Sequence, residues 1–597
     1  MQLALIDWII VVSFFVTTLA IGATVSRQAG KSTSEFFLSG RNMPWWLLGF
    51  SMVATTFAAD TPLTVTNMVR VDGVSSNWEW WSLLLTGMLT VFVYAKLWRR
   101  SLVTTDLGFY ELRYSGKPAA FLRGFRALYL GVVFNAIVMG NVTLAAIKIG
   151  HVMFGLSPVE TIASVALVCT IFSAMGGLRG VLITDCILFA TAMVGSVGAA
   201  WCCLGLEQVG GLKNLLSNEA VVEKMTMMPK FDFRSEAATN VVMSIFIVPL
   251  LVQWWSVFYP GAEPGGGGYV AQRILSAKDE KHATGATLLF NVFHYAIRPW
   301  PWILVALASM LVYPDVASLA KAFPELPKDK VHFDLAYPAM LVFLPVGLKG
   351  LVVASLIAAY MSTMSTMLNW GSSYIVYDFW NRFVQPDANE KELVRVGRVS
   401  TVLLMAAGCG MALIMESALD NFRIILQIGA GTGLLYILRW YWWRINPYSE
   451  IAAMVASLVV AIGMMKFAPD SFPEWAKLVA GVAITTIVWM AVTLLTPRDS
   501  DERLYDFYRR IRPGGPGWRR IREKARVEGV DLGTGHDRSG IIVGVVCMVV
   551  ACLGTYAILF GTGYWLYSQQ SRAILCAVVA LISALIIAVL WNRVHED

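Results

Sequence analysis

Charged residues are scarce in this sequence: they make up 15% of its 597 residues, whereas 57% are hydrophobic. Soluble globular proteins carry about a quarter charged residues, so a water-soluble fold is excluded. Apolar runs of about 20 residues, long enough to cross a ~30 Å hydrocarbon core, recur from one end of the chain to the other. Because these runs are too long and too continuously apolar for barrel strands, we expect an all-α polytopic membrane protein.

Residue patterns that would mark an enzyme or a metal centre are also missing. The six histidines lack metal-site spacing, and no nucleophile–base motif or cofactor fingerprint occurs, so we expect no enzymatic activity. The glycine run 265–268 is not followed by Gly-Lys-Ser/Thr, which excludes a phosphate loop. All eight cysteines lie inside apolar segments, where we expect small core residues rather than disulfides: Cys169, Cys186, Cys202, Cys203, Cys409, Cys547, Cys552 and Cys576.

Hydropathy predicts fifteen membrane-spanning helices. They cover residues 5–26, 44–66, 78–98, 125–153, 158–175, 181–207, 239–262, 284–312, 349–378, 394–416, 420–442, 448–466, 475–496, 539–562 and 572–593. The first run has no basic segment before it and is too long for a signal peptide, so we expect it to be retained. Basic residues gather in alternate loops, which places the N-terminus outside and the C-terminus in the cytoplasm of a cell, expected to be bacterial, with the chain in its inner membrane.

The net charge of +7 is unevenly distributed, because most of the excess lies between two predicted helices, in residues 498–538. A cytoplasmic linker explains it better than a nucleic-acid partner, which we do not expect. Basic amphipathic pieces flank a Pro-Gly-Gly-Pro-Gly turn at 513–517. Such pieces are typical of a solvated loop, which we favour, or of a surface that binds anionic lipid or a partner.

Two of the predicted helices are interrupted. The second carries polar residues in mid-membrane between Ala54 and Pro62, and the seventh runs into segment 259–268, whose two prolines and five glycines cannot remain helical. The two breaks lie five spans apart, and because five is odd, the second break is inverted relative to the first. This arrangement is typical of inverted-repeat transporters, with a proline kink of no transport role as the alternative.

Hydroxyl groups are concentrated in the ninth predicted helix. Ala359, Ser362, Thr363 and Thr366 lie at i, i+3, i+4 and i+7 and therefore share one face. Hydroxyls, together with carbonyls freed by a broken helix, supply the oxygen ligands that a hard monovalent cation needs. Paired with Ala54–Phe57, this face predicts a sodium site. The alternative is that these hydroxyls let helices pack closely or bond back to their own helix.

Several motifs occur in a family-specific order. Phe36-Phe37-Leu38-Ser39-Gly40-Arg41 is followed by Pro44-Trp45-Trp46, Ser51 to Asp60, Met175 to Asp185, Gln272 to Lys278 and the hydroxyl run of the ninth helix. Over about residues 5–445 the chain resembles the solute:sodium symporter family. The resemblance implies a LeuT-type fold of two inverted five-helix repeats with one extra N-terminal helix. Hydropathy adds four C-terminal helices, which gives about 15 transmembrane helices in all.

The resemblance, hydropathy and charge together divide the chain into six parts. They are an N-terminal helix and loop (1–43), the first repeat (44–207), the second repeat (208–445), two accessory helices (446–497), the basic linker (498–538) and two C-terminal helices (539–597).

The resemblance implies one Na⁺ site or two. The first would be formed by the carbonyls of Ala54, Phe57 and Ala359 and the hydroxyls of Ser362 and Thr363. A second, seen in some members, would correspond to Asp185, Ser362, Ser365 and Thr366. An ionisable residue at membrane depth is itself typical of a functional site, although a structural hydrogen bond is the alternative for Asp185.

For the solute, the segment Asn77–Ser82 is similar to the place where sugar-transporting members use a glutamate and a serine. Glu79 and Ser82 lie at i and i+3, and the neighbouring tryptophans suit stacking on a sugar or belong to an interfacial aromatic belt. Thr61 and His294 fall near further sugar-binding positions, with histidine in place of lysine. The other candidates are Gln253, Trp254, Trp255 and Glu263, where the chain departs from the family, and Gln427.

These features together predict a sodium-coupled symporter that imports a small polar organic solute, with a sugar or sugar-like compound as the first choice. An amino acid, a sialic acid or a carboxylate is the alternative solute, and a transporter-like sensor without tight coupling is the alternative class. The expected partners are the solute, sodium ions and membrane lipids.

Overall fold

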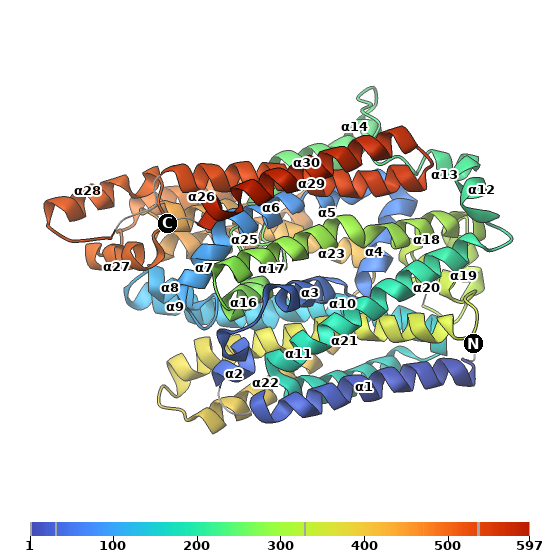
Figure 1. The fold of residues 1–597 in the computed structure, drawn as a ribbon, viewed down its shortest axis with the longest axis horizontal. Coiled ribbons are helices and arrows are strands. Elements are labelled where there is room, and N and C mark those ends of the chain that lie inside the picture. Colours follow the sequence, from blue (N-terminus) through green and yellow to red (C-terminus); the bar gives the residue numbers. More distant parts are fainter. Residues whose placement is uncertain (1–2, 30–32, 328–329, 470, 534–537, 596–597) are drawn as a thin grey trace.

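The computed structural model describes residues 3–29, 33–327, 330–469, 471–533 and 538–595, and its regular elements are helices. The helices run along the long axis of the molecule (Figure 1). At one edge of the bundle lie α29 (Arg538–Leu566) and α30 (Gln570–His595), and at the other lie α1 (Leu5–Ala29) and α22 (Glu390–Ile414). The two ends of the chain lie at opposite ends of the bundle.

Eleven helices in the described part of the chain are long and apolar enough to cross a membrane. They are Val74–Ser101, Gly116–Phe154, Leu178–Leu204, Glu236–Ser256, Glu280–Val312, Leu348–Val384, Glu390–Ile414, Pro447–Phe467, Glu474–Leu495, Gly540–Leu566 and Gln570–His595. Each matches one predicted span. Of the other four predictions, two correspond to shorter apolar helical stretches, Leu5–Thr18 and Pro158–Ile171, and two to interrupted helices.

The first interrupted helix consists of α3 (Trp45–Thr56) and α4 (Asp60–Asp72), separated by residues 57–59. In the second, α15 (Trp254–Ser256) is followed by non-helical chain up to α16 (Gly268–Ser276). Glycines at 261, 265 and 266 have φ between +77° and +86° there, a conformation that side chains disfavour. Both predicted breaks are confirmed.

A third break was not predicted, and the expectation of one continuous helix over 420–442 is wrong. The chain leaves α23 (Ala418–Gly429) and enters α24 (Gly433–Tyr441) through a turn at Gly431, whose φ is +83°. At this point Val257 and Ala430 form an antiparallel β-bridge. Phe258 N–H donates to the carbonyl of Gly429 (3.1 Å), and Gly431 N–H donates to that of Ser256 (2.8 Å). Two broken helices thus satisfy each other's freed backbone groups.

Helix α11 is assigned over Pro158–Leu204 and includes both spans predicted at 158–175 and 181–207. In a straight helix Cys169 and Gly195 would lie about 39 Å apart. Yet Cys169 lines the same cavity as Tyr360, and a Cβ at Gly195 would lie 2.8 Å from Ser355 Oγ. Ser355 and Tyr360 are only five residues apart on α21 (Leu348–Ser373). Helix α11 is therefore not straight, and both of its halves lie beside this part of α21.

The basic linker forms two helices, α27 (Asp501–Ile511) and α28 (Arg519–Val527), which project at the end of the bundle where the C-terminus lies (Figure 1). The solvated-loop interpretation is wrong for its apolar face. Phe507 and Trp518 are fully buried, and Trp518 Nε1 donates to the carbonyl of Trp440 in α24 (2.8 Å). The linker therefore packs on the transmembrane bundle, with the charged side chains on its outer face.

Candidate functional site

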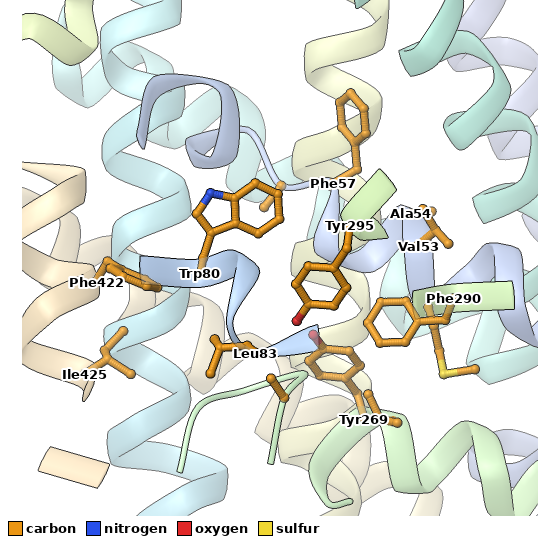
Figure 2. Close-up of a cluster of buried hydrophobic side chains, with 14 of the residues drawn as sticks. Val53, Ala54, Phe57, Trp80, Leu83, Tyr269, Phe290, Tyr295, Phe422 and Ile425 are labelled. Atoms are coloured by element: carbon orange, nitrogen blue, oxygen red, sulfur yellow. The ribbon is translucent and has the colours of Figure 1, made fainter. Parts of the chain in front are cut away.

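A cavity of about 130 Å³ lies where the breaks at residues 57–59 and 257–267 meet. The helix ends beside the first break contribute Thr55, Thr56, Asp60 and Thr61 to its wall, the second break contributes Tyr259 and Gly261, and α16 contributes Tyr269. Other helices contribute Trp80, Asn141, His294, Tyr295, Arg298, Thr363 and Phe422. Figure 2 shows part of this wall, where Tyr269 and Tyr295 point their hydroxyl groups toward one another. The combination of apolar rings with a few polar groups is typical of a small-molecule site.

The hydroxyl face of α21 lies against the end of α3, as the predicted sodium site requires. Thr363 Oγ1 donates to the carbonyl of Thr55 (2.8 Å) and lies 3.1 Å from that of Ala359. Ser362 Oγ donates to Asp185 Oδ1 (2.6 Å). A hydroxyl that donates its hydrogen keeps its lone pairs, so both oxygens remain able to face a cation.

Two of the three carbonyls assigned to the same site, those of Ala54 and Phe57, lie at the end of α3, and that of Ala359 lies within α21. Phe57 N–H donates to the carbonyls of Ala54 (3.0 Å) and Val53 (2.9 Å), which closes the last turn of α3. A carbonyl oxygen has two lone pairs, so one bond leaves Ala54 with further accepting capacity. The donor set of hydroxyls and carbonyls fits a monovalent cation, and its use for sodium remains a prediction.

Asp185 is fully buried and joins α11, α3 and α21. Its Oδ2 accepts from Ser51 Oγ (2.5 Å), and its Oδ1 accepts from Ser362. The guanidinium of Arg273 in α16 approaches the same Ser51 Oγ at 3.3 Å. A buried carboxylate and a buried arginine thus compensate each other through one serine.

The other residues of the predicted second sodium site face different partners. Ser365 Oγ donates to the carbonyl of Ser362 in its own helix (3.1 Å), and Thr366 Oγ1 accepts from Arg273 Nη2 (2.7 Å). The structure brings Asp185 and Ser362 together, whereas the positively charged side chain of Arg273 contacts Thr366. The second site remains a prediction.

Two of the predicted solute residues line the cavity, Thr61 and His294. Trp80 from the Asn77–Ser82 segment also lines it and packs edge-on against His294, with ring centroids 5.6 Å apart, and it stacks on Tyr295 at 5.7 Å. Because Trp78, Trp80 and Trp81 are all buried, this segment lies inside the protein and does not form an interfacial belt.

His294 holds Arg298 at the cavity wall. Arg298 Nη2 lies 3.3 Å from His294 Nε2, and Thr56 Oγ1 lies 2.8 Å from His294 Nδ1. Since a guanidinium can only donate, His294 Nε2 accepts, which assigns the proton to Nδ1 and makes the imidazole neutral. His294 is therefore a neutral link between the first break and an arginine.

Three further candidates line a second cavity, of about 250 Å³: Glu79, Gln253 and Gln427. Glu79 pairs with Arg423, whose Nη2 donates to Oε1 at 2.7 Å, and Gln253 Nε2 donates to the Glu79 carbonyl at 2.6 Å. Gln427 Nε2 donates to the carbonyl of Glu474 at 3.4 Å. These side chains do not join the Thr61–His294 cavity.

The remaining candidates line neither cavity. Ser82 Oγ bonds back to the Glu79 carbonyl, Trp254 accepts from Thr86 through its carbonyl, and Trp255 Nε1 donates to its own helix. Glu263 is buried in the glycine-rich segment, and neither of its carboxylate oxygens has a hydrogen-bond partner among the described residues.

Two charged residues of the cavity were not among the predicted ligands, Asp60 and Arg298. Asp60 Oδ2 accepts from Asn141 Nδ2 (2.6 Å), whose amide oxygen accepts in turn from Asn421 (3.0 Å). A charge inside a predicted membrane span was the sequence signal that could have identified both.

Interrupted helices that meet at a cavity inside a bundle of membrane-spanning helices define a secondary transporter of the LeuT type. The pattern of the sodium:solute symporter family matches residues 36–459, more than half of the sequence, and the chain belongs to this family. It is thus a multi-pass, sodium-coupled solute symporter and not an enzyme.

Known relatives agree with this assignment. The chain is 26% identical to a sodium/glucose cotransporter of Vibrio parahaemolyticus, over 84% of this chain and 92% of that protein. It is 24% identical to sodium/myo-inositol cotransporter 2 of Oryctolagus cuniculus, over 76% of this chain and 69% of that protein. Its fold is similar to that of a Na⁺-coupled sialic acid symporter in a substrate-bound outward-open state, with a TM-score of 0.66, 19% identity and coverage of 84% of this chain and 99% of the other.

Proposed function

We propose that the chain imports a small polar organic solute with sodium by alternating access, and that the solute is a sugar or a sugar-like compound. The observation that carries the proposal is the position of Thr363, which lines the cavity while its hydroxyl belongs to the candidate sodium site. An ion bound there would stabilise the wall against which the solute packs. If sodium raises solute affinity, solute must raise sodium affinity by the same factor.

The solute class is supported by what the relatives are named for, glucose and myo-inositol. Trp80, Thr61 and His294 supply an aromatic face and polar groups of the kind that bind polyhydroxyl compounds. Ala54, Phe57, Ala359, Ser362 and Thr363 are proposed to hold the first Na⁺, and Asp185 to serve a second. The linker would lie in the cytoplasm, because it carries the excess of basic residues.

The test replaces Ser362 and Thr363 together with alanine. Binding of radioactive sodium to the purified protein should fall at least tenfold, because two oxygen ligands are lost, and sodium-stimulated uptake into proteoliposomes should disappear. Thr401→Ala is the matched control, since its hydroxyl is also buried but only bonds to the Gly397 carbonyl of its own helix. Unchanged sodium binding in a folded double variant would refute the assignment.

A further inference from the structure

The cavity contains two opposite charges that are not paired directly with each other. Arg298 is 1% exposed, and Asp60 Oδ1 is buried without a hydrogen-bond partner among the described residues. The side-chain hydrogen bonds of Asp60 and Arg298 go to other groups, although both residues line the same cavity. Buried charges are retained at membrane depth when they have a function, because leaving them unpaired is costly.

All direct partners of Arg298 are neutral. Its guanidinium donates to the carbonyls of His294 (3.2 Å) and Val53 (3.5 Å), to Thr56 Oγ1 (3.2 Å) and to the neutral His294 ring (3.3 Å). It also lies over the faces of Phe57 and Trp302, with 5.9 Å and 5.4 Å from Cζ to the ring centroids. These contacts fix the side chain in place and leave its positive charge without a direct counter-charge.

Asp60 is also held in place by neutral groups. The chain of amides from Asn421 through Asn141 to Asp60 Oδ2 fixes the carboxylate at the start of α4. The second oxygen, Oδ1, is the one without a partner. The cavity therefore offers a positive site and, separately, an acceptor site.

From this arrangement we propose that the transported solute carries a carboxylate, which binds Arg298, and a hydrogen-bond donor, which binds Asp60 Oδ1. The inference rests on the proposed sodium symport and narrows its solute to a sugar acid, a hydroxy acid or an amino acid. Arginine suits this role because its guanidinium stays positively charged, and its contacts within the protein leave one N–H of Nη2 for a carboxylate oxygen. A volume of about 130 Å³ is small beside the ~300–1,000 Å³ of drug-sized sites, which favours a compact solute.

The test compares matched pairs of compounds with the full-length protein in sodium: uronic acids with the parent sugars, hydroxy acids with their amides, and amino acids with their amides. We expect acids to raise the thermal unfolding temperature and their neutral partners to have little effect. In Arg298→Gln the affinity for the best acid should fall roughly 10- to 100-fold, and Arg298→Lys should recover part of it. Arg70→Gln is the control, because Arg70 is buried outside the cavity.

A second variant identifies the donor end of the solute. If the donor is an ammonium group, Asp60→Asn should lower the affinity for an amino acid more than the affinity for the corresponding hydroxy acid. If the donor is a hydroxyl group, the two affinities should fall equally. The proposal is overturned if neutral sugars bind as well as their acids, if no acid binds in sodium, or if Arg298→Gln leaves acid affinity unchanged. Sodium-dependent uptake of a neutral sugar by the wild-type protein would refute the carboxylate while leaving sodium symport intact. If the wild-type protein took up every solute independently of sodium, the proposed symport itself would be refuted.

Discussion

Single residues proposed for the sodium site could be singled out from the sequence because they are close together in it. Ser362 and Thr363 are adjacent on α21, and the break after α3 is marked by its own polar residues, so one helix face and one break define the pair. The solute site depends on tertiary contacts that no local pattern encodes. Glu79 turns to Arg423, for example, and leaves the cavity wall to Trp80, one residue further along the chain.

At the same scale, Asp185→Asn tests the second cation. The substitution keeps the shape of the side chain but removes the charge that faces Arg273 through Ser51. If Asp185 serves a second sodium ion, the number of charges moved per solute should fall in an electrogenic assay on proteoliposomes. An unaltered ratio would mean that Asp185 only holds Ser51 and Ser362 in place.

Among the helices, the two breaks rich in proline, glycine or polar residues could be predicted, and the break at Ala430–Thr432 could not. Glycines at 429, 431 and 433 weaken a helix, but without a proline they do not show by themselves where it ends. The reason for the break lies in another part of the chain, where Ser256 and Phe258 offer backbone partners to this segment. A tertiary contact between two helices decided the local structure.

Gly429→Ala should destabilise this contact. The added Cβ would lie 2.2 Å from the carbonyl oxygen of Phe258 and 2.9 Å from its nitrogen, and backbone atoms cannot move aside cheaply. We expect a loss of about 1–3 kcal/mol in stability, seen as a lower thermal unfolding temperature in detergent. Gly463→Ala is the matched control, because its Cβ would meet nothing within 4 Å. Equal behaviour of the two variants would contradict the close approach.

For the whole molecule, the all-helical polytopic character and the positions of eleven spans could be predicted from hydropathy, while the fold of the linker was missed. Its apolar residues are spaced among many arginines, so its composition is that of a solvated loop. The structure buries this face against Arg113, whose guanidinium lies over the rings of Phe507 and Trp518 and donates to the carbonyls of Arg439 and Trp443.

Trp518→Ala should release the linker from the bundle. The variant loses a fully buried ring and its hydrogen bond to Trp440, a change that costs about 3–5 kcal/mol in typical cores. Trypsin should then cleave the arginine-rich linker several times faster than in the wild type. Arg519→Ala is the control, because its exposed pair with Glu523 contributes little. Equal cleavage rates for both variants would show that the linker is not held by Trp518.

The bridge between Val257 and Ala430 also bears on how such a protein can change over evolution. Its two hydrogen bonds use only main-chain groups, so they do not depend on which side chains stand at these two positions. Selection for specificity can therefore alter the surrounding side chains without uncoupling the two broken helices. The constraint falls instead on Gly429 and Gly433, where the chains approach too closely for any side chain.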